Sequence, residues 1–559
     1  MALTLHKWIR LDLSTVPLPS GAGPLLHHHP IIRAAGGEAA PVQERNEIHY
    51  DTPDLQLYRN RVALTLNRRG EQWIQRLGLE EGSGQETKWV ETAVPDQQLD
   101  LKTIRKTPLF PTLNGSDARN LAPVFTLHCR EQTWSIHFPG GVSILLREER
   151  GYLKFGATRH PFHELVFEHQ AGPLARWFQT ALDLAYSLFL HEKTGPEKID
   201  YREKSGPGLI GMTPVTRGFA WLDPTLLIPP VDQKIKASGT TDEAKPDEEW
   251  SPVQSDMTAR QAFVHLCSGL LRRLQEYQCI VLYGGKQAKL AGVPLLFQTT
   301  GRLHALLSLY DPLFPREIGT ELEEETGWLL KELTLVQACQ MLLQETLEPL
   351  TEQFATHPGL EEMLLKTKNG LILAIKRLER ALTSFRYARL VLGMESWLTG
   401  TLWEFLSDPV QREELEMPIG RLATNWLQES HAQVRKRGRK WSGMDLAALC
   451  ALRDDIDRMA HATILFADLF ANKRQETGAR AKPSESRISF QESLNRVQHT
   501  THLLVHVQTS SRFLTRGVNT KEGSANHPIQ AWQEARIHRH LLDASREWEL
   551  FSSKTSFWH

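Results

Sequence analysis

The spacing of the apolar residues changes partway along this 559-residue chain, and this change restricts the folds that it can adopt. As far as about residue 170, apolar and polar residues alternate in short segments, as at 61–68, 125–138 and 142–149. Successive side chains of a β-strand point to opposite faces of a sheet, so this pattern predicts half-buried strands of an antiparallel sheet or barrel. At 172–191 the apolar residues switch to the spacing of a helix.

Helical spacing continues through most of the chain beyond residue 257. It predicts helices at 258–279, 295–310, 321–355, 358–384, 386–407, 418–437, 444–472 and 485–515. Short strands followed by a long helical run are typical of an α+β protein. We therefore expect an N-terminal antiparallel β-barrel followed by an all-α helical-bundle domain.

Composition separates these two parts. Residues 204–257 are rich in Gly and Pro and then in acidic residues, which predicts a linker that is extended at first and then flexible. The predicted organisation is a barrel domain at 1–203, the linker at 204–257, a helical domain at 258–515 and a C-terminal tail at 516–559. We expect Trp532, Trp548 and Trp558 of the tail to dock on the helical domain, and binding of a protein partner is the alternative.

The formal net charge of the chain is close to neutral, at −1. Bulk charge therefore gives no reason to expect nucleic acid or a membrane as a partner, and any polyanion site must be a local patch. The five cysteines include no Cys-x-x-Cys pair, which favours reduced thiols over disulfides or a structural zinc. The N-terminus lacks the pattern of a secretory signal, and no apolar run reaches the roughly 18 residues of a membrane span. We expect a cytoplasmic protein.

One stretch of the N-terminal region carries a motif. Tyr50-Asp-Thr-Pro-Asp54 reads as a turn, and the next two alternating segments read as antiparallel strands. With 121–134, 144–151 and 164–172, this stretch resembles the CYTH family of inorganic triphosphatases, class IV adenylate cyclases and thiamine triphosphatases. The resemblance implies a β-tunnel in which cations hold triphosphate and carboxylates hold Mg or Mn ions.

The helical region carries motifs of its own. Segments 295–310, 328–333, 384–398 and 451–470 resemble the CHAD domain, a pair of four-helix repeats that often follows a CYTH domain. That domain is associated with polyphosphate through the basic faces of its helices. The order of tunnel, linker and CHAD domain is more specific than either set of motifs alone.

The two resemblances imply site residues, although no catalytic residue is assigned. They imply phosphate binding by Arg10, Arg61, Arg76, Arg147, Arg302, Arg453 and Arg458, and metal binding by Glu149, Glu164 and Glu168. The parity of the strands predicts that Arg10, Arg76 and Arg147 point into the tunnel with the three glutamates.

Several family positions are filled by other residue types. The first strand has His6 and Trp8 where the family has glutamates, and Leu145 and Val166 replace two further carboxylates. The basic helix faces are thinned as well, and Asp457 stands where phosphate would bind. The metal ligands are therefore fewer than in the family. One basic cluster remains in the helical region, at 435–440, at the end of a predicted helix. That cluster is either a solvated helix end or part of a polyphosphate surface shared with Arg386, Arg389 or Arg453.

Three functions remain open at the level of sequence. The first is a divergent protein that binds inorganic triphosphate or polyphosphate with weak or lost catalysis. The second is an active inorganic triphosphatase that requires Mg or Mn, and the third is a scaffold for a protein partner. A barrel that holds both signs of charge can also neutralise itself through internal ion pairs.

Overall fold

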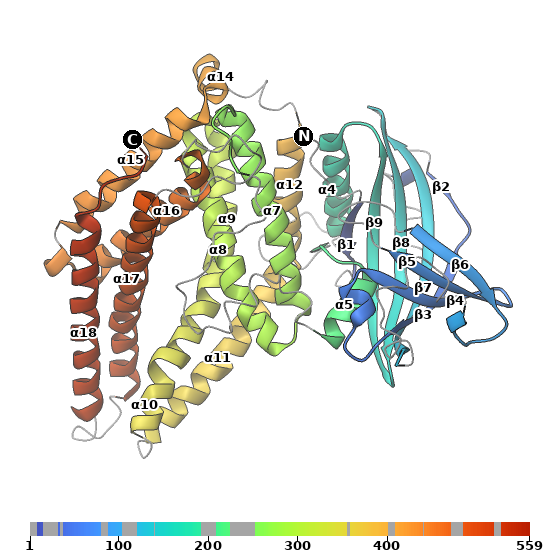
Figure 1. The fold of residues 1–559 in the computed structure, drawn as a ribbon, viewed down its shortest axis with the longest axis horizontal. Coiled ribbons are helices and arrows are strands. Elements are labelled where there is room, and N and C mark those ends of the chain that lie inside the picture. The colour runs from blue at the N-terminus through green and yellow to red at the C-terminus, as the bar shows by residue number, and fades with distance from the viewer. Residues whose placement is uncertain are drawn as a thin grey trace. The chain divides into compact units, whose positions relative to one another are not determined.

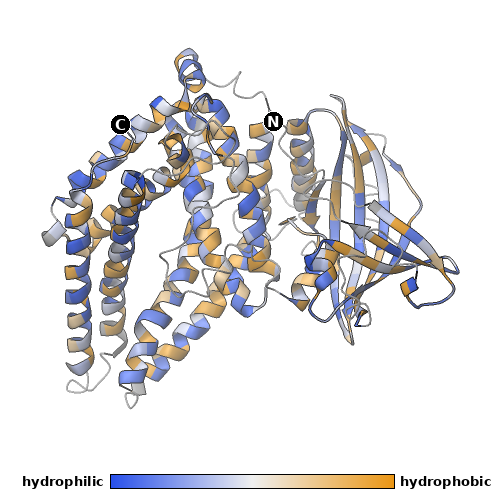
Figure 2. Cartoon of the chain, viewed as in Figure 1, coloured by the Kyte–Doolittle hydropathy of each residue, from blue (hydrophilic) through white to orange (hydrophobic). Residues whose placement is uncertain are grey.

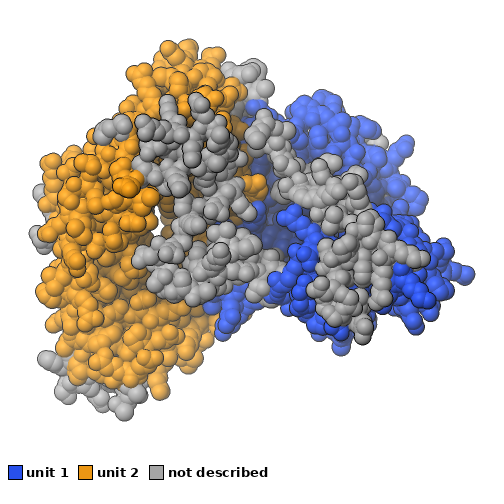
Figure 3. All heavy atoms as spheres, viewed as in Figure 1, with its two compact units in different colours: residues 1–233, 275–292, 380–400 blue, residues 234–274, 293–379, 401–559 orange. Residues whose placement is uncertain are grey.

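The computed structural model describes residues 8–14, 32–33, 37–79, 88–102, 120–138, 140–191, 208–223, 252–354, 358–400, 408–439, 441–470, 485–518 and 527–558. The chain forms two compact units, which Figure 3 shows in different colours. Unit 1 comprises Met1–Gln233, Gln275–Gly292 and Arg380–Gly400, and unit 2 comprises Lys234–Leu274, Val293–Glu379 and Thr401–His559. Two segments of the predicted helical domain therefore belong to the same unit as the sheet.

Unit 1 is built on an antiparallel sheet (Figure 1). Its strands are β1 (Trp8–Asp12), β2 (Glu38–Ala39), β3 (Gln43–Asp51), β4 (Val62–Arg69), β5 (Gln72–Leu79), β6 (Lys88–Val94), β7 (Ala122–Phe138), β8 (Val142–Phe155), β9 (Thr158–Ala171) and β10 (Gly208–Ile210). They follow the order β10-β1-β9-β8-β7-β3-β4-β5-β6, with β2 paired to β7. The predicted antiparallel sheet is confirmed. Within the described strands β6 and β10 are the outer ones, and no pairing between them closes the sheet into a barrel.

One face of this sheet is largely apolar and carries a helix. Leu146, Leu165 and Phe167 on this face are fully buried. The predicted helix at 172–191 is confirmed as α4 (Leu174–His191), which packs on β8 and β9. α12 (Phe385–Thr399) packs on α4 in turn, which explains why a segment from the predicted helical domain belongs to unit 1.

Within the predicted linker at 204–257, residues 208–223 form a strand and a helix. β10 pairs with β1, and α5 (Pro214–Leu222) begins at an N-cap in which the Thr213 hydroxyl accepts a hydrogen bond from the Thr216 amide. Phe219 of α5 joins an apolar cluster with Phe125 and Phe162 of the sheet. Elements this short carry too few residues for a periodic signal, and packing rather than propensity stabilises them.

The predicted helical run is confirmed in the described residues. Its elements are α7 (Ala259–Tyr283), α8 (Lys286–Tyr310), α9 (Arg316–Met341), the π-helix η6 (Leu342–Leu347), α10 (Glu348–Gln353), α11 (Pro358–Leu382), α12, α14 (Pro409–Glu416), α15 (Ile419–Gly438), α16 (Leu446–Leu465), α17 (Glu485–Val518) and α18 (His527–Ser552). The helix expected at 295–310 begins earlier, because α8 continues through Pro294. Figure 2 shows that most helices carry both hydrophobic and hydrophilic residues. None of the described helices is long and apolar enough to cross a membrane.

The C-terminal tail docks on unit 2, as predicted from its aromatic residues. α18 lies beside α17 (Figure 1). Trp548 stacks on Trp441 with ring centroids 5.7 Å apart, and the Trp558 indole donates a hydrogen bond to the Gln428 side chain. These contacts hold the tail against the α15 region through buried aromatic surface.

The contact between α15 and Trp548 yields a prediction. A Cβ added at Gly438 would lie 2.0 Å from two atoms of the Trp548 ring, so Gly438→Ala should destabilise unit 2 by about 1–3 kcal/mol. Gly370 in α11 has nothing within 4 Å of its added Cβ, so Gly370→Ala should stabilise by about 0.5–1 kcal/mol. Urea unfolding followed by tryptophan fluorescence measures both changes. Equal stabilisation by the two substitutions would contradict this packing.

Candidate functional site

The strand register brings charged side chains from most strands to the face opposite α4. Glu131, Glu149 and Glu164 lie side by side on β7, β8 and β9. The residues that share this face, here called the charged face, include Arg10 (β1), Arg45 and Glu47 (β3), Thr65 and Asn67 (β4), Arg76 (β5), Glu91 (β6), Arg147 (β8) and Glu168 (β9). The alternation predicted from sequence therefore gathers both signs of charge on one surface.

Arg10 lies at the centre of the charged face. Its Nη1 atom is 2.7 Å from a carboxylate oxygen of Glu149 and 2.7 Å from one of Glu164, and all three side chains are buried. Arg217 of α5 donates a hydrogen bond to the other oxygen of Glu164. Burial raises the pKa of Glu149, but the charge and hydrogen bond of Arg10 outweigh this effect and hold that pKa below its usual range.

The other cations of the charged face are paired as well. Arg147 Nη1 lies 2.6 Å from Glu168, and Arg147 Nε lies 3.7 Å from Glu149. Arg45 contacts Glu47 at 3.1 Å and Glu131 at 3.2 Å. In the described part of the sheet, each arginine of this face thus has a carboxylate partner, and the face is largely neutral.

Five of the predicted residues of the N-terminal domain belong to this network, namely Arg10, Arg147, Glu149, Glu164 and Glu168. Arg76 shares their face but pairs with Glu91 at 2.9 Å, and its guanidinium lies 4.2 Å from the Trp89 ring. Arg61 is exposed in the turn before β4, with a left-handed φ of 58°, and has no ion pair with the described network. The predicted roles of these residues in phosphate and metal binding stay predictions.

Sequence reasoning missed four members of the network. Arg45, Glu47 and Glu131 alternate with other residues along β3 and β7, so the period-two pattern held a signal for them. Arg217 gave none, because it lies in the segment that composition assigns to a linker.

The residues present do not fit a metal centre. Glu149 and Glu164 share the Arg10 guanidinium, and Glu168 is bound by Arg147. A divalent cation placed between Glu149 and Glu164 would have to displace a buried positive charge. Within the described residues, no group of three or more His, Cys, Asp or Glu side chains can hold a metal ion.

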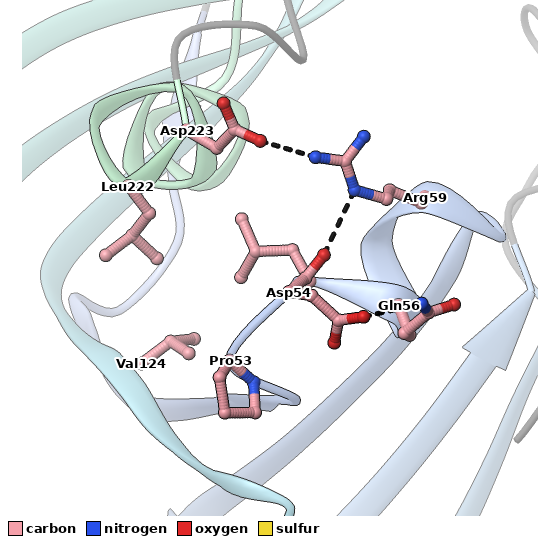
Figure 4. A pocket seen from close by; sticks show the side chains of 8 residues that line it. Pro53, Asp54, Gln56, Arg59, Val124, Leu222 and Asp223 are labelled. Atoms are coloured by element: carbon pink, nitrogen blue, oxygen red, sulfur yellow. Dashed lines mark hydrogen bonds and ion pairs between the residues drawn. The ribbon is translucent and has the colours of Figure 1, made fainter. Parts of the chain in front are cut away.

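A pocket of about 540 Å³ lies beside the turn motif (Figure 4). It is lined by Pro53, Asp54, Leu55, Gln56, Arg59, Val124, Leu222 and Asp223. Arg59, in the short helix α2 (Gln56–Arg59), bonds the Asp223 carboxylate and the Asp54 carbonyl oxygen. None of the predicted site residues lines this pocket.

In unit 2, the predicted arginines Arg302 and Arg458 lie near the partly buried histidines His461 and His304, respectively. Arg302 of α8 lowers the pKa of His461 on α16, which burial has already lowered, to about 4. Asp457 accepts hydrogen bonds from Gln498 and His502 of α17. Burial raises the pKa of Asp457, but its bond with His502 outweighs this and lowers it. The Asp457 carboxylate is thus held by hydrogen bonds within unit 2.

The second charged feature of unit 2 is the basic end of α15, defined here as Arg435, Lys436, Arg437 and Arg439. Arg437 lies 2.8 Å from Asp455 of α16, and Arg458 lies 3.7 Å from the same carboxylate. Arg435, Lys436 and Arg439 are exposed, and no described carboxylate pairs with them. Lys440 lies outside the described residues.

The predicted partners of this basic end are placed differently. Arg386 and Arg389 belong to unit 1, and Arg453 pairs with Asp454 at 2.7 Å. Arg458 is the predicted phosphate-binding residue that Asp455 links to the end of α15.

Residues 296–508 match the family model of the CHAD domain. Similar solved structures include the CHAD domain from the plant Ricinus communis, with a TM-score of 0.43 and 18% identity over 55% of this chain and 95% of that chain. PptA from Streptomyces chartreusis has a TM-score of 0.35 and 11% identity over 52% and 100% of the two chains. HpAC1 from Hippeastrum, a protein with a dominant triphosphatase activity, has a TM-score of 0.21 and 13% identity over 33% and 87%. None of the curated proteins matches the chain.

The bridge made by Arg10 yields a stability prediction. Arg10→Met would leave two buried carboxylates without their shared cation and should destabilise unit 1 by about 3–5 kcal/mol. Arg76→Met, which breaks a partly exposed pair, should cost only about 1 kcal/mol. Adding Glu149→Gln to Arg10→Met should restore part of the loss. Urea unfolding measures all four proteins, and equal costs for the two arginines would rule out a central role for Arg10.

A pH prediction follows from Glu47. Burial raises the pKa of Glu47, but the neighbouring His49 and Arg45 side chains outweigh burial and lower it to about 2. A carboxyl group whose pKa is depressed in the folded state stabilises the fold above its unfolded pKa of about 4.3, and this contribution is lost as the pH falls towards 2. The difference in melting temperature between the native protein and Glu47→Gln should therefore shrink from pH 5 to pH 2. A difference that stays constant over about these three pH units would contradict the assignment.

Proposed function

We propose that this protein binds inorganic polyphosphate on the helices of residues 296–508, which match the family model of the CHAD domain, and does not hydrolyse triphosphate on its β-sheet. The observation that carries the proposal is the contrast between the arginines of the two units. The charged face pairs its arginines with carboxylates, whereas the basic end of α15 offers exposed cations that have no described carboxylate partner.

Polyphosphate is a flexible chain that carries negative charge at regular intervals, so its binding needs several cations along one surface. The basic end of α15 supplies Arg435, Lys436 and Arg439, and Arg437 and Arg458 lie beside them through Asp455. The C-terminal end of a helix places its carbonyl groups there, which favours cations at this end even without a ligand. A bound polyanion would pair with cations that no described carboxylate of the protein neutralises.

The charged face is poorly suited to hydrolysis. A metal-dependent triphosphatase uses carboxylates to hold the metal and cations to hold the phosphates. Here the same carboxylates and cations bind each other, and Arg217 of α5 adds a second bond to Glu164. We further propose that the sheet closes into the tunnel of the CYTH-like fold, with this neutral network as its lining.

Binding is tested with the full chain and fluorescently labelled long-chain polyphosphate. The triple change Arg435→Gln, Lys436→Gln and Arg439→Gln should weaken binding by about tenfold or more, which corresponds to about 1.4 kcal/mol. The matched control changes Lys366, Lys368 and Arg412 to Gln, three exposed cations on α11 and α14 of the same unit. This control lowers the net charge equally and should change binding by less than about twofold. Equal losses in the two variants would show that net charge alone, and not this surface, attracts the ligand.

Hydrolysis is tested separately on the same protein with triphosphate and either Mg or Mn. We expect no turnover above the background, and turnover of about 1 per second or faster would overturn the second half of the proposal. Binding of polyphosphate should persist in a chelator. Binding that requires the metal would favour the enzyme, and absence of polyphosphate binding would favour a scaffold for a protein partner.

A further inference from the structure

A second group of basic side chains lies elsewhere in unit 2, around the π-helix η6. The π-helix interrupts the helical run between α9 and α10, and such single π-turns are frequently found at functional sites. Thr346 lies on this turn and is fully buried. Its hydroxyl is 3.1 Å from His506 Nε2 and 3.5 Å from Ser510 Oγ, both on α17. The π-turn therefore directs a hydroxyl group towards the neighbouring helices.

Arg536 of α18 reaches the same hydroxyl. Its Nη1 atom lies 3.5 Å from Thr346 Oγ1, and its guanidinium lies 4.7 Å from the Trp532 ring. Among the described residues no carboxylate lies within ion-pair distance of Arg536. Arg539 and His540 lie on the same helix, so three helical elements bring cationic or titratable groups to one place.

Positive charge is disfavoured at this place. Burial lowers the pKa of Arg536, and the charge of Arg539 lowers it further, although Glu345 acts in the opposite direction. Burial, Arg536 and His540 together lower the pKa of His506 to about 4. Burial and Arg536 also lower the pKa of His540, with Asp543 and Glu345 opposing them. The two carboxylates offset the cations only in part, and a bound anion would relieve this repulsion.

We propose that Thr346, His506 and Arg536 form a binding site for a phosphate-type oxyanion. The guanidinium fork bonds two oxygens of such an anion and the His506 imidazole bonds a third, while the buried Thr346 hydroxyl positions Arg536 and His506. Trp532 holds the guanidinium plane through a cation–π contact. Arg536 and His506 are partly exposed, so an anion can reach them from solvent.

This site is distinct from the basic end of α15. Arg536 and Trp532 lie on α18, beyond the residues that match the CHAD domain model. The ligand is either free phosphate or the terminal phosphoryl group of a longer chain. The two have the same oxyanion chemistry at the site, and only the length of the ligand separates them.

The test is calorimetric titration of the full chain with inorganic phosphate, tripolyphosphate and acetate. Binding of inorganic phosphate identifies a site for free phosphate, and binding of tripolyphosphate alone identifies a site for a chain end. Arg536→Gln should weaken either binding by about tenfold or more. Arg496→Gln is the matched control, because Arg496 of α17 is half-exposed and already pairs with Glu547 of α18. It should leave anion binding within about twofold of the native value.

A second measurement separates a binding role from a structural one. Without ligand, Arg536→Gln should keep or raise the melting temperature, because it removes a charge that burial disfavours. The rise in melting temperature that phosphate produces should be lost in this variant and kept in Arg496→Gln. The proposal is overturned if no phosphate compound binds at about 10 mM, if acetate binds equally well, or if Arg536→Gln binds like the native protein. These outcomes do not depend on whether the α15 end binds polyphosphate.

Discussion

The guanidinium of Arg10 joins two buried carboxylates, Glu149 and Glu164, and the arrangement of unit 1 depends on this bond. Removal of a charged side chain from water costs several kcal/mol unless an opposite charge and hydrogen bonds replace the water. β1 supplies that opposite charge to β8 and β9 at once. Arg217 completes the pairing, so the short helix α5 stays against the sheet although its own propensity is weak. Arg10 thus connects the register of β1 with the position of α5.

The same bond restricts what the sheet can do. In a tunnel that acts on triphosphate, the ligand supplies negative charge and the metal supplies positive charge. In this protein the side chains supply both, because Arg147 and Arg45 are paired to glutamates as Arg10 is. A ligand would have to break ion pairs that are already formed among buried side chains. Its net free energy of binding would be only the difference between the bonds that it makes and the ion pairs that it breaks. The arginines that hold these carboxylates therefore limit what the charged face can bind.

Much of this could be predicted from the sequence, and the remainder could not for identifiable reasons. The alternation of apolar residues located β4, β7 and β8, and its parity placed Arg147 and Glu149 on one face, because the geometry of a strand is local. Arg217 could not be found, since its segment resembles a linker and folds only against the sheet. The membership of α12 in unit 1 depends on packing against α4, which periodicity does not specify. The positions of Arg217 and α12 thus depend on packing between segments that are far apart in the sequence.

The satisfied and unsatisfied cations of this protein therefore indicate different roles. When a cation is paired with a carboxylate of the protein, the ion pair forms as the chain folds and contributes to the stability of the folded state. A ligand would have to break this pair before it could bind the cation, so the cation offers little to a ligand. Arg536 and Arg435 have no such ion pair with a described carboxylate, so their charges remain available for binding a ligand. Since a ligand gains free energy only from bonds that folding has left unmade, binding should depend on these cations of unit 2. The arginines of the charged face then determine whether the sheet is stable.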